Sequence, residues 1–319
     1  MRNIEKDIEQ FEAAGEFLDK DSFTAARLSL FLLDNLAELL MYNVAKIELS
    51  RDERLASIRL PSYSAGKRQK ILRHFNPKVN FLVQKRQLDP LQGHILKVGH
   101  RLRNEAYHNG VLRENIIIPV ARAYFQTVCE LIPTLWTGHC VFADYTEVQD
   151  FLKKYGQDSA FIDRDILKDI CRTILKGREC DVSELAKAVS NDLVLRIEET
   201  IESIEQLALD QKGSPEDLLK WIQFREKTDL EFGVDAVSHE EWLEFQREVK
   251  VRLAAFRPKV TLRTLQTWKK KAKEISSENS GGAILAKFNE IDKPFLEDIE
   301  NPVVQAVWQY EEDIGLTSM

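Results

Sequence analysis

The sequence contains few residues that break helices or cross-link a chain. Its 319 residues include 13 glycines, 9 prolines and 4 cysteines. Turn-rich β folds use more glycine and proline, so this composition favours helices. The cysteines form no CxxC pair and show no metal-ligand spacing, which indicates buried thiols in a reducing compartment. They are Cys129, Cys140, Cys171 and Cys180.

Targeting and cofactor signals are also missing. The N-terminus is charged from its first residues and lacks the apolar core of a signal peptide, and no run of eighteen apolar residues occurs. We therefore expect a cytoplasmic protein that is neither exported nor membrane-spanning. There is no glycine-rich phosphate loop, HExxH pair or calcium loop, so we expect no cofactor and no metal.

Helical periodicity runs through most of the chain and predicts an all-α fold. The longest apolar helix is expected from Phe23 to about Leu49 and another at 115–136. We expect an N-terminal helical bundle over residues 1–145, followed by a helical C-terminal domain of unknown role over residues 146–319.

One stretch of the second half has a second interpretation, as a DNA-binding motif. From Ile174 the sequence is similar to a helix-turn-helix, with SELAKAV as a short first helix. DNA-reading helices carry basic and amide side chains, whereas the expected second helix, VLRIEETIESIEQ, is strongly acidic. A regulator acting through this stretch is a third possibility, behind the two functions described below.

Charge is distributed unevenly along the chain. Residues 64–104 carry ten lysines and arginines and one acid, a net charge of +9, although the whole chain carries −7. The remainder therefore carries −16. A basic block can be a solvated helix face, but it also suits a polyanion, because phosphate contacts supply most nucleic-acid affinity.

The basic block leads into HRLRNEAYHNG, residues 100–110. Arg103 and His108 stand five positions apart, and Asn104 follows the arginine. A guanidinium can hold a phosphate through two parallel hydrogen bonds, and an imidazole can take and give a proton near neutral pH. Cleavage of an RNA phosphodiester requires both abilities. The alternative for His108 is an ordinary histidine at the C-terminal end of a helix.

The segment LRNEAYHNG is similar to the signature of the HEPN superfamily, in which an arginine and a polar residue precede a histidine on a late helix of a small helical domain. The resemblance covers about the first 145 residues. It implies metal-independent RNA cleavage at a dimer interface, leaving a 2′,3′-cyclic phosphate. His108 would transfer protons, Arg103 would stabilise phosphoryl charge, and Asn104 would bind or orient the phosphate.

The basic and acidic neighbours of the motif have expected roles as well. On an unbroken helix Arg101 shares a face with His108, so Arg101 competes with Arg103, and the family pattern makes it a second phosphate contact. Asp34 and Glu38 form either a solvent-facing strip or the acidic support of a motif arginine, as in some HEPN domains. The expected RNA-binding residues of the basic block are Lys67, Arg68, Lys70 and Arg73.

The resemblance suggests a ribonuclease of a stress, toxin-antitoxin or antiviral defence system. RNA and a second copy of the chain are the expected partners, and a regulatory protein is a further one. The alternative is a non-catalytic HEPN-type scaffold that binds RNA or protein, in which Arg103 and His108 merely tie helices together.

Overall fold

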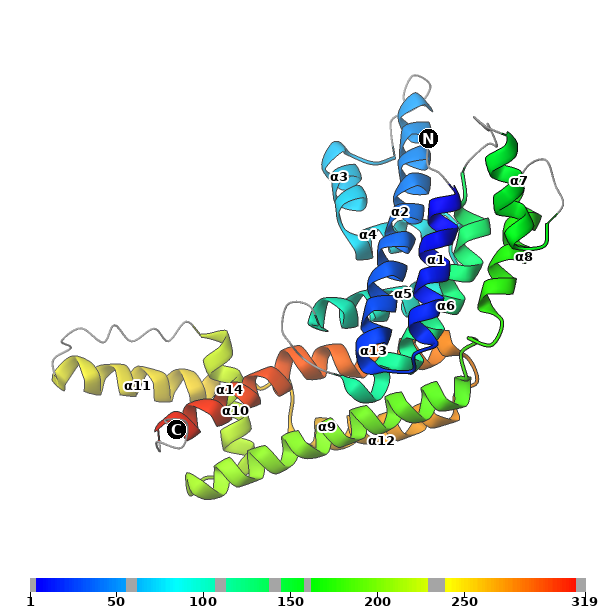
Figure 1. Cartoon of the computed structure of the whole chain (residues 1–319). Coiled ribbons are helices and arrows are strands. Elements are labelled where there is room, and N and C mark those ends of the chain that lie inside the picture. Colours follow the sequence, from blue (N-terminus) through cyan, green and yellow to red (C-terminus); the bar gives the residue numbers. More distant parts are fainter. Residues whose placement is uncertain are drawn as a thin grey trace. The chain divides into compact units, whose positions relative to one another are not determined.

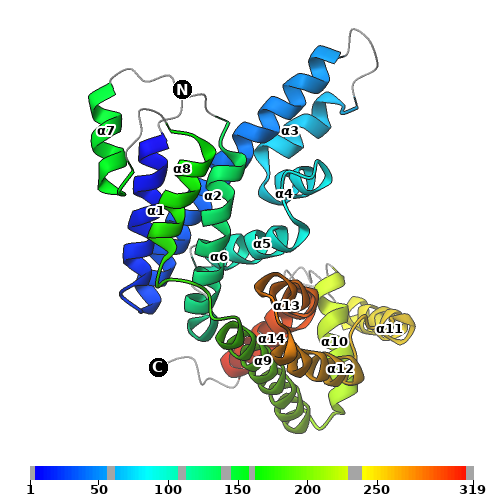
Figure 2. The same cartoon turned by 90° about the vertical axis from the view of Figure 1, so that its right-hand side faces the viewer.

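A computed structural model describes residues 4–55, 62–106, 113–137, 145–157, 162–228 and 239–313. This part of the chain is all-helical and contains no strand, which confirms the predicted fold class. Figures 1 and 2 show the helices in two views. They are α1 (Ile4–Leu18), α2 (Phe23–Arg54), α3 (Ala65–Arg73), α4 (Phe75–Gln84), α5 (Pro90–Asn104), α6 (Glu114–Leu135), α7 (Tyr145–Lys154), α8 (Arg164–Leu175), α9 (Val182–Asp210), α10 (Pro215–Lys227), α11 (His239–Ala255), α12 (Leu262–Glu274), α13 (Gly281–Phe295) and α14 (Asn301–Asp313).

The chain forms two compact units. Unit 1 comprises residues 1–189 and 277–286, and unit 2 comprises residues 190–276 and 287–319. The expected domain boundary near residue 145 falls inside unit 1, because α8 packs against α6 and α1. The division between the units falls within α9 and again within α13.

The core of unit 1 is built on α2 and α6. These two helices pack against each other and against α1, and both views show the three side by side (Figures 1 and 2). Ser22 caps α2 by accepting a hydrogen bond from the backbone N–H of Ala25. Phe11 of α1 stacks on Phe125 of α6 with ring centroids 4.3 Å apart. The apolar sequence of α2 and α6 is therefore used for packing.

By length and composition alone, α2 and α6 are apolar enough to cross a membrane. Within the unit, 56% of the apolar window of α2 and 78% of that of α6 are buried. Core helices of water-soluble bundles meet the same length and composition criterion as membrane spans. Packing against neighbouring helices is thus a sufficient reason for their apolar sequence here.

The other helices of unit 1 are fixed to this core by polar contacts. The Arg178 guanidinium, beyond α8, binds the Asp19 carboxylate with Nε–Oδ1 and Nη2–Oδ2 distances of 2.8 and 2.6 Å. This hydrogen-bonded pair lowers the pKa of Asp19. Cys129 of α6 and Cys171 of α8 are buried and free, and their contact together with burial raises the pKa of Cys171.

Unit 2 contains a largely buried arginine that pairs with three carboxylates. Arg196 of α9 lies 3.3 Å from Asp192 and 2.6 Å from Asp292, and it also pairs with Glu300. Despite burial, these carboxylates raise the pKa of Arg196 above its usual range. A buried charge of this kind persists only when it is paired and hydrogen-bonded.

The helix-turn-helix interpretation is wrong. Residues Val182–Asp210 form one helix of 29 residues, so no turn separates SELAKAV from the acidic stretch. The reason is local, because no glycine or proline interrupts this sequence and Asp181 caps its start by accepting from the N–H groups of Ser183 and Glu184.

Candidate functional site

The candidate site lies at the C-terminal end of α5. The helix begins at a capping box in which the Asp89 side chain accepts a backbone N–H and Gln92 reaches back to the backbone of Asp89, with Pro90 in the first turn. Its buried side chains include Ile95, Leu96, Val98 and Leu102. This apolar stripe fixes the rotation of the helix, and therefore the direction in which the last-turn side chains point.

Asp34 of α2 is the centre of the site. Its side chain is buried, with 1% of the residue exposed. It accepts hydrogen bonds from His100 Nδ1, at 3.0 and 3.1 Å to its two oxygens, and from the Tyr124 hydroxyl at 2.9 Å. The Arg103 Nε lies 3.6 Å from Asp34 Oδ2, which is an ion pair but too long for a hydrogen bond. Three helices therefore meet at one buried carboxylate.

The carboxylate also affects its tyrosine partner. Tyr124 is fully buried in α6, and burial together with the nearby Asp34 charge raises the pKa of its hydroxyl well above the usual range. The hydroxyl therefore stays protonated and donates to Asp34 near neutral pH. Gly99 makes this contact possible, because a Cβ at that position would lie 2.1 Å from Tyr124 Cδ2.

His100, Asn104 and Arg103 form a chain of hydrogen bonds with a defined direction. Arg103 Nη1 donates to Asn104 Oδ1 at 2.7 Å, since a guanidinium has only donors. The Asn104 amide nitrogen then faces His100 Nε2 at 3.1 Å and donates to it. If Nε2 accepts, the proton of the neutral imidazole is on Nδ1, where it meets Asp34. The network thus assigns one tautomer to His100.

Aromatic rings pack against the side chains of His100 and Arg103. The imidazole of His100 stacks on the ring of Phe75, with centroids 3.8 Å apart and planes 5° from parallel. The Arg103 guanidinium lies 4.9 Å from the ring centroid of Phe31. The Arg103 side chain retains 29% exposure although its Nε is buried, so a side chain held by Asp34, Asn104 and Phe31 is still partly accessible to solvent.

Arg101 has a different environment. Its Nη1 lies 3.1 Å from Oε1 of the buried Glu105, and Arg113 Nε lies 2.9 Å from Oε2 of the same carboxylate. Arg27 Nη2 donates to the backbone carbonyl of Ala106 at 2.8 Å. These contacts fix the described residues on both sides of 107–112. Arg101 therefore has a structural role here, because its contact with Glu105 helps to hold the end of α5.

The acidic candidates Asp34 and Glu38 have separate partners. Asp34 faces the motif helix, whereas Glu38 Oε1 lies 2.8 Å from Nζ of Lys78 on α4. Lys78 is a fully enclosed member of the basic block, with 1% exposure. At Asp34, therefore, α2 does not form a solvent-facing strip.

The predicted RNA-binding residues of α3 divide into two groups. Arg68 donates to the backbone carbonyl of Tyr63 at 2.9 Å and pairs with Asp52 and Glu53, so it ties α3 to the end of α2. The exposed basic residues of this helix are Lys67, Lys70 and Arg73. Part of the basic block is thus structural, and part faces solvent.

His108 lies outside the described residues, as do Tyr107, Asn109 and Gly110. The structure therefore brings together Arg103, Asn104 and Asp34 from the predicted set, and it adds His100, which the motif did not single out. The spacing of His100, Arg103 and Asn104, at i, i+3 and i+4 of one helix, places them on a common face and was the available signal. Among the described residues no group of three His, Cys, Asp or Glu side chains is arranged to hold a metal ion.

Comparisons with protein-family models, with curated proteins and with solved structures returned no match.

Proposed function

We propose that unit 1 is a metal-independent endoribonuclease of HEPN type. The observation that carries the proposal is the position of Arg103, whose guanidinium is paired with Asp34 and hydrogen-bonded to Asn104 and whose side chain is still partly exposed. A fixed guanidinium in that setting suits a phosphate, because its planar donors match two phosphoryl oxygens. The proposal also rests on the sequence resemblance of residues 102–110.

The proposed reaction is an internal transesterification. The ribose 2′-oxygen attacks the adjacent phosphorus, the bond from phosphorus to the 5′-oxygen breaks, and the products are a 2′,3′-cyclic phosphate and a 5′-hydroxyl. By the resemblance, His108 takes the proton from the 2′-hydroxyl or returns one to the leaving 5′-oxygen. Arg103 stabilises the charge that develops on the non-bridging oxygens.

The geometry gives Asn104 and His100 positioning roles in this scheme. Asn104 bridges Arg103 and His100, so its side chain orients the guanidinium and does not point independently at a substrate. His100 is hydrogen-bonded to both Asp34 and Asn104, so it links Asn104 to the buried carboxylate. Arg101 is less suited to contact phosphate, because its guanidinium is held by the buried Glu105, which also pairs with Arg113.

Exposed basic residues offer a path for the strand. Three residues of α3 are exposed and positively charged, namely Lys67, Lys70 and Arg73. Arg68 is different, because it forms ion pairs with carboxylates of α2. By analogy with the superfamily, we also propose that the active form is a homodimer and that the protein acts in stress response, toxin-antitoxin or antiviral defence.

The alternative proposal is a non-catalytic scaffold that binds RNA or protein. The observation that favours it is that Asp34 ties α2, α5 and α6 together, which is a structural task in itself. The two proposals differ in what happens when Arg103 or His108 is changed, because a scaffold has no turnover to lose.

The test is cleavage of a broad RNA set by the purified full chain in EDTA. We expect Arg103→Ala to lower the rate about 100- to 1,000-fold, as for loss of one transition-state donor, and His108→Ala to lower it by roughly 100-fold or more. Arg252→Ala, which changes an exposed arginine of α11, is the matched control and should cleave like the wild type. Circular dichroism and thermal unfolding would establish that each variant is folded.

Two results would overturn the nuclease proposal. One is a wild-type preparation that binds RNA without cutting it in EDTA, which would favour the scaffold. The other is cleavage at an unchanged rate by folded Arg103→Ala, which would show that the observed activity has another source.

A further inference from the structure

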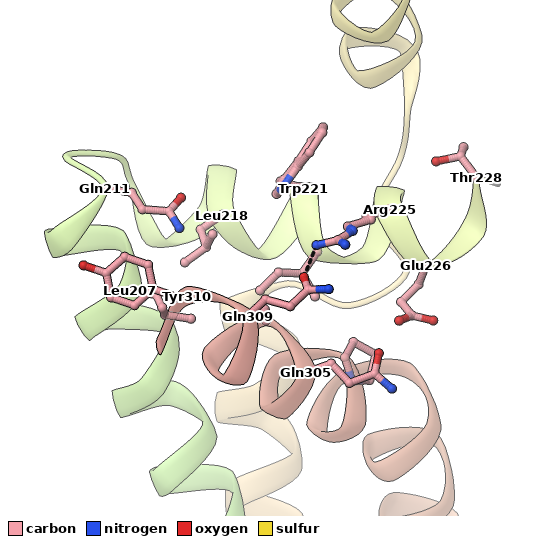
Figure 3. Close-up of a pocket in the computed structure, with 13 residues that line it drawn as sticks. Leu207, Gln211, Leu218, Trp221, Arg225, Glu226, Thr228, Gln305, Gln309 and Tyr310 are labelled. Carbon is pink, nitrogen blue, oxygen red and sulfur yellow. Dashed lines mark hydrogen bonds between the residues drawn. The ribbon is translucent and has the colours of Figure 1, made fainter. Parts of the chain in front are cut away.

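Unit 2 contains two adjoining hollows. The first, of about 410 Å³, lies among the end of α9, α10 and α14 and is shown in Figure 3, where Gln211, Gln305 and Gln309 supply side-chain amides. The second, of about 580 Å³, lies between α9 and α14. Leu207 and Tyr310 line both hollows, so the two lie next to each other, and we call them together the unit 2 groove.

The groove has apolar groups along its floor and rim. Leu207 is buried at its base, and Val307 of α14 lines the second hollow. Next to Val307, the side chains of Val304 and Trp308 are 41% and 65% exposed. Val304, Val307 and Trp308 stand at i, i+3 and i+4, so they form one apolar strip of α14. Trp308 lines neither hollow, but an exposed tryptophan on the helix that forms part of their wall is typical of a protein interaction site.

The second hollow is strongly acidic, whereas Arg225 and Glu226 of the first hollow offset each other. Glu199, Glu202 and Asp210 of α9 and Glu311 of α14 line the second hollow. Between Ser190 and Asp210, and along α14, the sequence has nine acidic residues and one basic residue, Arg196. Arg196 cannot offset these surface charges, because it is engaged by the buried carboxylates of its own cluster. Such a surface repels phosphate and anionic lipid and attracts cationic groups.

We propose that the unit 2 groove binds a cationic amphipathic helix of a partner protein. The lining residues of α9 extend from Glu199 to Asp210, which is about 17 Å of helix and matches roughly three turns of a bound helix. Apolar side chains of the partner would contact Leu207, Val307 and Trp308, and its lysines or arginines would face the acidic rim. This is the helix-in-groove mode of recognition, and it does not depend on the proposed function of unit 1.

The experiment measures binding of a fluorescein-labelled 14-residue peptide of leucine and lysine, with the leucines at helical spacing, to the full chain by fluorescence anisotropy. We expect the charge-reversal variant Glu202→Lys/Glu311→Lys to weaken binding about tenfold. Trp308→Ala should weaken it by a similar factor, roughly that of an interface anchor.

The matched control is Glu205→Lys/Glu216→Lys, which makes the same change in net charge at residues that do not line either hollow. It should bind the peptide within about twofold of the wild type. A second peptide, with alanine in place of leucine and the same charge, should bind about tenfold more weakly, because it lacks the apolar face.

Each of the opposite outcomes would overturn the proposal. Equal losses in the groove variant and in the control would show general electrostatic attraction. Equal affinity of the alanine peptide would show a site for polycations without an apolar component, as would full displacement by spermine. Absence of saturable binding up to about 1 mM peptide would show that the groove does not receive such a helix.

Discussion

Gly99 offers the sharpest test of the contact between α5 and α6. A methyl group at this position would lie 2.1 and 2.5 Å from two ring carbons of Tyr124, whereas ordinary contacts begin near 3.4 Å. In Gly99→Ala the fully buried ring must therefore move by roughly 1.3 Å, which would break its 2.9 Å hydrogen bond to Asp34. The substitution perturbs the packing and the carboxylate network together.

The expected cost follows from three contributions. Overpacking a core costs about 1–3 kcal/mol, and loss of a buried hydrogen bond to a charged group costs about 1.5–3 kcal/mol. Alanine regains up to about 1 kcal/mol of helix propensity. We expect Gly99→Ala to lower the free energy of unfolding of unit 1 by about 1.5–5 kcal/mol in urea titrations followed by circular dichroism.

The control is Gly66→Ala in α3, where an added Cβ has no neighbour within 4 Å. This variant should unfold at the same urea concentration as the wild type or at a slightly higher one. A double variant adds a further check, because Tyr124→Leu should cost at least 1 kcal/mol less in the Gly99→Ala background. Equal stability of Gly99→Ala and Gly66→Ala would refute the close approach of α5 to Tyr124.

Three further predictions follow from other contacts. Arg196→Met should destabilise unit 2 by about 3–5 kcal/mol, because it leaves buried carboxylates unpaired, and a normal thermal midpoint would contradict this. Gly282→Ala should be more damaging than Gly281→Ala in urea titration, since its Cβ would lie 2.4 Å from a leucine Cβ of α5, against 3.6 Å for the nearest neighbour of Gly281. Burial and a glutamate partner raise the pKa of Tyr155 to about 12, above the usual 10, so its contribution to stability is complete below pH 10 and is lost as the pH rises towards 12. Tyr155→Phe should therefore reduce the fall in stability between pH 10 and 12, and an unchanged profile would count against this role.

Local sequence signals were sufficient to predict the helices. Ser22, Asp89 and Ser214 each cap a helix, and Pro90 and Pro215 occupy first-turn positions. These signals act over three or four residues, so they can be recognised without knowing the fold. The helix-turn-helix interpretation, which the acidic composition already disfavoured, failed because no glycine or proline separates SELAKAV from the acidic stretch and the helix continues from 182 to 210.

The candidate site was only partly predictable. Arg103 and Asn104 could be selected from the motif, but the choice between Asp34 and Glu38 depends on how α2 is rotated against helices 40 to 69 residues away in sequence. His100 was missed for the same reason, because its importance comes from Asp34 and not from its neighbours in the chain. Tertiary packing decides such contacts, and sequence periodicity identifies only the face on which a residue lies.

The most direct test of the proposed function uses a pair of RNA oligonucleotides that differ by one 2′-deoxy nucleotide at a mapped cleavage position, incubated with the full chain in EDTA. The proposal predicts a 2′,3′-cyclic phosphate and a 5′-hydroxyl at that position in the all-ribose strand, and no cut there in the substituted strand. Cleavage at the deoxy position would contradict it, because the attacking 2′-oxygen would be missing.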